Sequence, residues 1–231
     1  MFQLCQDADV PDRPDRSERR SDALSKARIV RAAIETLDEG GADALTFRAL
    51  AARLSTGPGA IYHHVTNKND LLSSAVDDLM RAVLAPSAPE GTHPDIRAVM
   101  LAAFDAITAH PWLGTQLVTA PWQPAVLRLL DRVGTELSRL GVPAGAQFDA
   151  ASVLVHHLLG VASQYDAGRT LAGMGHDRPG FLDAARLEME QPDGDDEHPF
   201  MARIAQQLAA HDDREQFGAG VDIILAGVAT L

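Results

Sequence analysis

Side chains that can donate hydrogen bonds to an anion are concentrated in one part of the sequence. Tyr62 offers a hydroxyl, and two ring N–H groups follow it at His63 and His64. Lys68 comes at the expected start of a further helix, where free backbone N–H groups already favour an anion. The whole set is Thr46, Arg48, Tyr62, His63, His64 and Lys68. Groups of these types contact phosphate oxygens of nucleic acids, where they set position and salt dependence.

Two short helices with a tight break between them must position these donors. Thr46 is a good N-cap for a helix over 47–54. Gly57 and Pro58 suit the cap and first turn of a second helix over 58–64, because proline needs no N–H there. The buried face of the first helix would be Phe47, Leu50, Ala51 and Leu54. This spacing is typical of a helix-turn-helix, whose second helix points its N-terminal end into the major groove of DNA.

Small residues occupy the start of that second helix. Gly59 and Ala60 would let the helix end approach base edges closely. The residues whose type and position suit bases are Pro58, Gly59, Ala60 and His63. Gly57 can contribute only its backbone N–H. We therefore expect few direct hydrogen bonds to base edges.

Apolar residues recur at helical spacing along nearly the whole chain, without strand-like alternation. The first expected helix carries Val30, Ile34 and Leu37 and ends at Gly40-Gly41. Other helices are expected around 72–83, 96–107, 112–120, 126–140, 148–171, 199–211 and 213–230, with a helical piece around 181–189 in a Gly/Pro/Asp-rich loop. In the 72–83 helix, Asp77, Asp78 and Arg81 are expected to face outward. One apolar stripe of the 126–140 helix is expected to contain Val126, Leu130, Val133, Leu137 and Leu140. The 148–171 helix is apolar nearly all round, as expected of a helix buried on several sides. The predicted fold class is all-α.

Composition divides the chain into three regions. Residues 1–20 are rich in Pro, Asp and Arg, and we expect a disordered arm. A helix-turn-helix DNA-binding domain is expected over 21–84, and a helical ligand-binding and dimerisation domain over 92–231. Pro86 and Pro89 break the chain between these two domains.

The charge is unevenly distributed. The 231 residues carry a net charge of −12, which at first argues against a nucleic-acid partner. Residues 17–68, however, carry eight Lys or Arg against six Asp or Glu, whereas 85–231 carry nine against nineteen. A locally basic surface on an acidic body fits this asymmetry, and a solvated face explains it about as well.

Several classes of protein are disfavoured. The one cysteine, Cys5, cannot form an intramolecular disulfide, so a reducing, cytoplasmic location is expected. The sequence has no uncharged apolar run of about 18 residues and no secretory signal pattern. Neither G-x-S-x-G, a phosphate-binding glycine loop nor H-E-x-x-H occurs, so we expect no enzyme and no cofactor.

The sequence resembles the TetR family of transcriptional repressors. The resemblance rests on L-T-F-R-A-L-A-A-R-L followed by G-P-G-A-I-Y-H-H-V-T-N-K-N-D-L-L, and covers roughly residues 24–84. The final F-G-A-G-V-D-I-I-L-A-G-V also resembles the last helix of the tetracycline-repressor-like branch. The resemblance implies a homodimer that binds a palindromic operator. A small molecule entering the C-terminal body would move the two DNA-reading helices apart and release the DNA.

The resemblance also implies roles for individual residues. Phosphate contacts in the family match Thr46, Arg48, Tyr62, His64 and Lys68, and base-facing positions match Pro58, Gly59 and His63. The turn departs from the family pattern, because Ser55-Thr56-Gly57 stands where Gly-Val-Ser is usual. Ser55 must then tolerate an unusual backbone angle, at a cost on the order of 1 kcal/mol.

The body offers two sets of candidate residues. A ligand pocket could be lined by Phe104, His110, Trp112, Trp122 and His157. A dimer seam between the last helix and the 148–171 helix could contain Val155, Leu159, Phe217, Val221, Ile224, Leu225 and Val228. An ordinary core is the alternative for both sets. Metal binding is not expected, because the neighbours His156 and His157 point about 100° apart on a helix.

These observations predict a dimeric, ligand-released transcriptional repressor. One alternative is a DNA-binding regulator, including an activator, that responds to no small molecule. The other is a helical small-molecule-binding protein or enzyme.

Overall fold

The computed structural model describes residues 24–85, 95–120, 122–173, 180, 183–184, 186–187, 199–210 and 212–231. The expected N-terminal arm, Pro86, Pro89 and most of the loop with its helical piece around 181–189 lie outside these residues. Helices, and no strands, make up the regular structure of the described part of the chain, which confirms the all-α class. No helix in that part is long and apolar enough to cross a bilayer.

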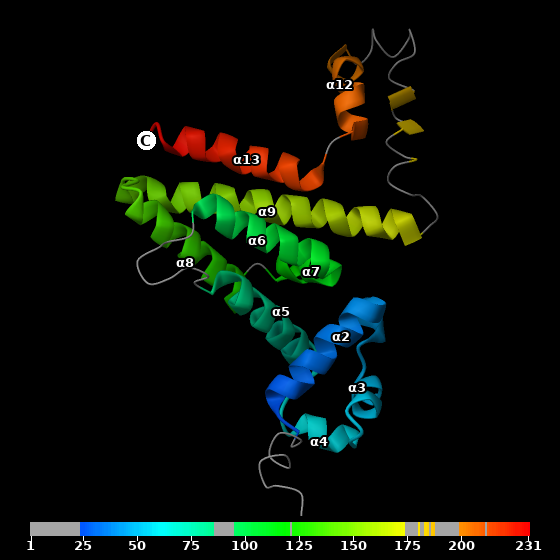
Figure 1. The fold of residues 1–231 in the computed structure, drawn as a ribbon. Helices are drawn as coiled ribbons and strands as arrows, with labels where there is room; N and C mark the ends of the chain where they lie inside the picture. Colours follow the sequence, from blue (N-terminus) through cyan, green and yellow to red (C-terminus); the bar gives the residue numbers. More distant parts are fainter. Residues whose placement is uncertain are drawn as a thin grey trace, which may run out of the picture.

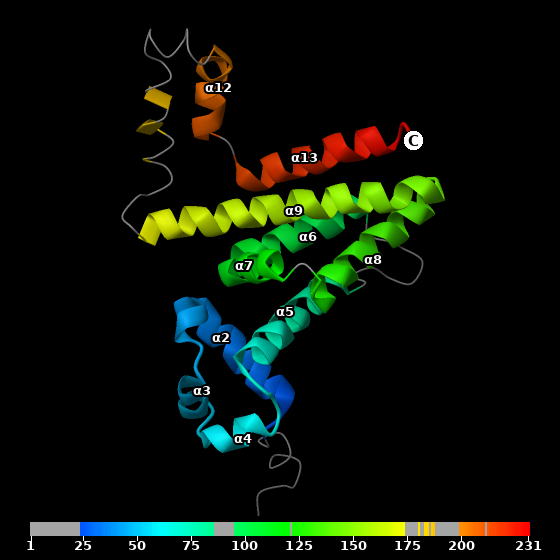
Figure 2. The same cartoon turned by 180° about the vertical axis from the view of Figure 1, so that it is seen from behind.

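Four helices form the N-terminal unit, which we call the head. They are α2 (Lys26–Ala44), α3 (Phe47–Arg53), α4 (Pro58–Tyr62) and α5 (Lys68–Leu84). Helix α2 is not continuous, because Gly41 has φ 68° and ψ −169° and breaks it near the expected end at Gly40-Gly41. Figures 1 and 2 place α4 at the end of the molecule opposite α13.

The remaining helices form the body. They are α6 (Ile96–Ala109), α7 (Pro111–Thr119), α8 (Pro124–Arg139), α9 (Ala144–Gly173), α12 (Pro199–Ala210) and α13 (Asp213–Val228). Helix α9 packs against α6, α7, α8 and α13, and runs alongside α13 in both views (Figures 1 and 2). Proline at the start of α7 and of α8 follows the rule that the first helical turn tolerates a missing N–H.

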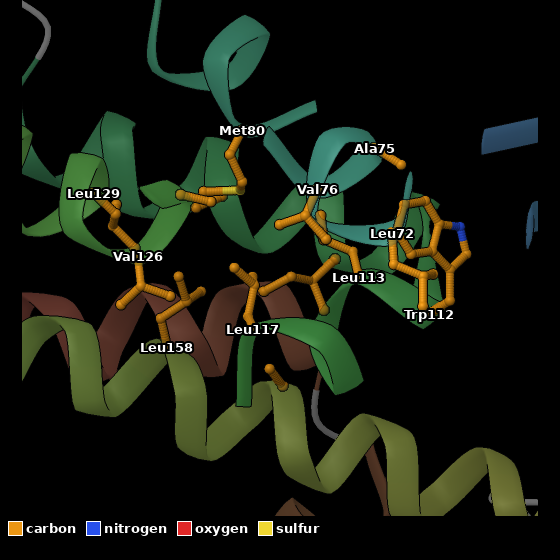
Figure 3. Packing of buried hydrophobic residues seen from close by; sticks show 14 of the residues in the cluster. Leu72, Ala75, Val76, Met80, Trp112, Leu113, Leu117, Val126, Leu129 and Leu158 are labelled. Atoms are coloured by element: carbon orange, nitrogen blue, oxygen red, sulfur yellow. The ribbon is translucent and has the colours of Figure 1, made fainter. Parts of the chain in front are cut away.

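Helix α5 joins the head to the body through the core. Its apolar face packs on α2 at one end and on α6, α7 and α8 at the other. Figure 3 shows Val76 and Met80 of α5 among side chains of α7 and α8 such as Leu117 and Leu129. A displacement of the body helices would therefore act directly on α5.

Two expectations about surface and core were wrong in detail. Asp77, expected to face solvent, forms ion pairs with Arg81 and with Arg128 of α8. Leu140, expected on the buried stripe of α8, is 68% exposed because the helix ends before it. Phe148, at the start of the helix expected to be buried on several sides, is 71% exposed, so one face of α9 is open in the single chain.

Candidate nucleic-acid interface

Helix α3 begins as the sequence predicts. Thr46 is extended at φ −128° and ψ 150°, and its Oγ1 accepts the backbone N–H of Ala49 at 3.1 Å. Leu50 and Ala51 anchor the helix in the core. Arg48 projects from the opposite side, exposed, and has no carboxylate partner in the described part of the chain. Its positive charge is therefore open to an external anion.

The turn after α3 reverses the chain at one residue. Ser55 has φ 52°, a left-handed angle that confirms the strain expected there. The N–H of Ser55 donates to the Ala52 carbonyl at 3.2 Å, and that of Thr56 to the Ala51 carbonyl at 2.9 Å. These two bonds form the Schellman arrangement that closes many helices, here with serine instead of glycine in the left-handed position.

Helix α4 starts without a side-chain cap. Gly57 is extended at φ −87° and ψ 148°, and Pro58 takes the first helical position, as predicted. Ile61 holds the helix on the core. A Cβ placed on Gly57 or Gly59 would meet no atom within 4 Å, so both glycines face open space. The N-terminal end of α4 therefore carries no bulky side chain at these two positions, and another molecule can approach its backbone closely.

The residues at the other end of α4 are fixed by α3. The ring of Tyr62 stacks on Phe47 with centroids 4.4 Å apart, while Tyr62 remains 55% exposed. His63 follows as the C-cap and is exposed, and His64 is half-buried. The stack ties α3 to α4 and holds the Tyr62 side chain at the surface. Phe47 was predicted only as a core residue, and its stacking on Tyr62 was not predicted from the sequence.

Lys68 has an internal partner that the sequence did not reveal. Its Nζ donates to the carbonyl of Ala42 at 2.6 Å, which ties the start of α5 to the end of α2. Asn67 caps α5 by accepting the N–H of Asp70, and the carboxylate of Asp70 accepts the N–H of Thr66 at 2.9 Å. An ammonium has three donors, so Lys68 keeps two for an anion.

Arg53 of α3 makes contacts with α2 that were not predicted from the sequence. It pairs with Glu35 at 3.2 Å and with Glu39. Its hydrogen bond to Glu39 raises the pKa of the Arg53 guanidinium above the ordinary arginine value. Glu35 and Glu39 lie one helical turn apart on α2, and the guanidinium of Arg53 reaches both carboxylates. Arg53 therefore braces α3 on α2, unlike the unpaired Arg48.

The five candidate pocket residues are divided among three places. Phe104 and His157 each stack on the ring of Phe217, with centroids 4.8 and 4.9 Å from it. His110 and Trp112 both reach Asp38 of α2 instead. Trp122 is 81% exposed between α7 and α8. Their assignment to a ligand pocket stays a prediction.

The candidate dimer residues are also divided. Val155, Phe217 and Val221 are at most 4% exposed in the single chain, so the protomer itself already buries them, and their place in a dimer seam stays a prediction. Their burial comes from the packing of α13 on α6 and α9. Leu159, Ile224, Leu225 and Val228 are half-buried at the edge of that core. The sequence pattern identified the apolar face of α13 but not its partner.

Comparison with known proteins gives a consistent assignment. A family model described as "Bacterial regulatory proteins, tetR family" matches residues 29–75, and one described as "Tetracyclin repressor-like, C-terminal domain" matches residues 86–231. An HTH-type transcriptional regulator of Saccharopolyspora erythraea is 31% identical over 209 residues, covering 86% of this chain and 88% of its own. The repressor DrrR1 of Streptomyces coeruleorubidus is 26% identical, covering 96% of this chain and 83% of its own.

A solved structure agrees with both domain matches. The transcriptional regulator SCO7222, a TetR from Streptomyces coelicolor, is 43% identical with a TM-score of 0.79. The similarity covers 90% of this chain and 99% of that one. The head geometry, the two domain matches and this similarity over nearly the full length agree, and the chain belongs to the TetR family of transcriptional regulators.

Proposed function

We propose that the chain is a cytoplasmic homodimeric repressor that binds a palindromic DNA operator and is released from it by a small molecule. The observation that carries the DNA part is the bare N-terminal end of α4. Gly57 and Gly59 face open space there, and Arg48, Tyr62 and His63 are exposed around it. A helix end of this shape fits the major groove, and the donors around it suit phosphates.

The residues divide between two tasks in this proposal. Phosphate contacts come from Thr46, Arg48, Tyr62, His64 and Lys68, which fix the register of α4 on the duplex. Base edges are met by Pro58, Gly59, Ala60 and His63. Only His63 in that second set has a polar side chain, so base discrimination by hydrogen bonds is sparse, and much of the sequence preference comes from DNA shape and apolar contact.

The proposed dimer uses the open face of α9 and α13. Leu159, Ile224, Leu225 and Val228 border it, and two exposed apolar residues extend it, Val153 at 49% and Ile223 at 74%. Burial of these side chains against a second copy would remove them from water. The dimer then sets the two α4 helices one helical turn of DNA apart, about 34–36 Å.

Release by a ligand is proposed for the body. The match of residues 86–231 to a tetracycline-repressor-like C-terminal domain supports it, as does the similarity to a protein named as a repressor. Helix α5 packs on body helices α6, α7 and α8, so a ligand that favours another arrangement of those helices also favours another placement of α4.

Gel shifts with DNA flanking the chain's own gene test the DNA part, and selection from random duplexes defines the operator. We expect a sequence-specific complex at moderate salt. Tyr62→Ala and Lys68→Ala should both weaken binding to all sequences, and Lys68→Ala, which removes a positive charge, should also reduce the salt dependence. Absence of any sequence-specific complex would contradict the proposal. An operator complex that no compound dissociates would favour a regulator without a small-molecule inducer.

A further inference from the structure

The carboxylate of Asp38 links α2 of the head to the body. Asp38 lies near the C-terminal end of α2, and its Oδ1 accepts the indole N–H of Trp112 at 2.7 Å. The same oxygen lies 2.8 Å from Nδ1 of His110. An ionised carboxylate can only accept, so His110 carries its proton on Nδ1 in this contact. Both donors come from the body, 72 and 74 residues further along the chain.

The two donors sit at the corner between α6 and α7. His110 ends α6 and also precedes the first residue of α7, with φ −125° and ψ 76°. Trp112 is 4% exposed, and Figure 3 shows it against Leu72 of α5. Trp112 thus packs with its ring on the helix that connects head and body, and bonds with its N–H to α2. The corner is held to two helices of the head at once.

From this geometry we infer that Asp38 is a positioning residue for DNA binding: it fixes the orientation of the head on the body through Trp112 and His110. The inference rests on the proposed function. In a dimer, the body sets where each head stands, and a palindrome is bound only when both α4 helices match successive major grooves. A head that loses the Asp38 bonds to the α6–α7 corner still presents an intact α4 and keeps the packing of α5 on the body, but its orientation relative to the partner's head is less firmly fixed.

The hydrogen bonds of Asp38 to Trp112 and His110 should contribute measurably to the contact between head and body. Hydrogen bonds to a charged group contribute more than neutral ones, and the Trp112 donor is buried. The Asp38 and His110 side chains are 34% and 25% exposed, so solvent screens their pair in part. Trp112 is therefore the principal partner, and removal of its acceptor leaves a buried N–H unpaired.

The test compares a full palindrome with a duplex that carries one half-site, both from selection with the wild-type protein. For Asp38→Ala we expect affinity for the palindrome to fall about tenfold or more, while affinity for the half-site duplex stays within about twofold. A merely structural role, in which the head is destabilised, would lower both affinities together. Asp78→Ala removes the same charge from an exposed position of α5 and should change neither.

Removal of the donor instead of the acceptor provides a second test. Trp112→Phe retains an aromatic ring and removes the N–H donor, and should reproduce the loss for the palindrome. If Asp38→Ala and Trp112→Phe both act by removing the Trp112–Asp38 hydrogen bond, the double variant should bind the palindrome no more weakly than Asp38→Ala alone. In a Trp122→Phe background Trp112 is the one remaining tryptophan, and its fluorescence should change on Asp38→Ala without any DNA.

Failure of the Asp38 inference can be distinguished from failure of the proposed function. Equal losses on palindrome and half-site, or no loss on either, would overturn the inference while the proposed function stands. A wild-type protein that shows no sequence-specific binding contradicts the proposed function, and the inference with it.

Discussion

Substitutions at Gly59 should change DNA binding without destabilising the fold. It is the second residue of α4, and a Cβ there would meet no atom of the chain within 4 Å. Gly59→Ala should therefore leave the fold intact and raise the free energy of unfolding by about 0.5 kcal/mol, part of the full glycine-to-alanine difference of about 1 kcal/mol in a helix. If α4 meets base edges through this end, the new methyl group occupies the space where a base comes close.

We expect Gly59→Ala to weaken operator binding about tenfold, or about 1.4 kcal/mol, and Gly59→Leu to weaken it more. Gly145 provides the matched control, since it is the second residue of α9, is exposed, and also has nothing within 4 Å of its Cβ position. Gly145→Ala and Gly145→Leu should not alter DNA binding. Fluorescence anisotropy with labelled operator and urea denaturation at one protein concentration measure both quantities. Unchanged operator affinity in Gly59→Leu would refute the placement of α4 in the groove.

Two further predictions concern the turn and the dimer. Ser55→Gly should raise the free energy of unfolding by about 0.5–1 kcal/mol, since glycine adopts the left-handed angle without a Cβ penalty; Ala52→Gly, on α3, should lower it, and equal effects in urea denaturation would contradict the reasoning. Ile223→Asp should shift the protein from dimer to monomer in analytical ultracentrifugation, because it places a charge in the proposed seam. Leu127→Asp on α8 is the control, and a dimer that survives Ile223→Asp unchanged would exclude that seam.

Local signals predicted the head well. The positions of the caps at Thr46 and Gly57, and of Pro58 in the first turn, depend on residues within four positions of each other. The left-handed angle of Ser55 follows for the same reason, because the short connection leaves little chain to reverse direction. Helical periodicity likewise gave the approximate extents of the body helices.

Contacts between distant segments were not predictable from those signals. Lys68 reaches a backbone carbonyl 26 residues away, and Trp112 a carboxylate 74 residues away. Periodicity shows that a face is apolar without showing what covers it. Phe217 and Val221 were accordingly assigned to a dimer seam, although α6 and α9 of the same chain already bury them.

The central claim is that the exposed donors around α4 bind DNA phosphates. The most direct measurement is the affinity of wild-type protein and Arg48→Ala for the selected operator over a range of salt concentrations. Arg48 has no carboxylate partner among the described residues, so its loss should leave folding unchanged. Arg203→Ala, an exposed cation of α12, controls for net charge.

We expect Arg48→Ala to lower the affinity for the operator and to make the slope of log affinity against log salt concentration shallower by about one unit per head. Arg203→Ala should keep the wild-type slope. If Arg48→Ala and wild type show the same affinity and the same slope, the assignment of this surface to DNA is wrong.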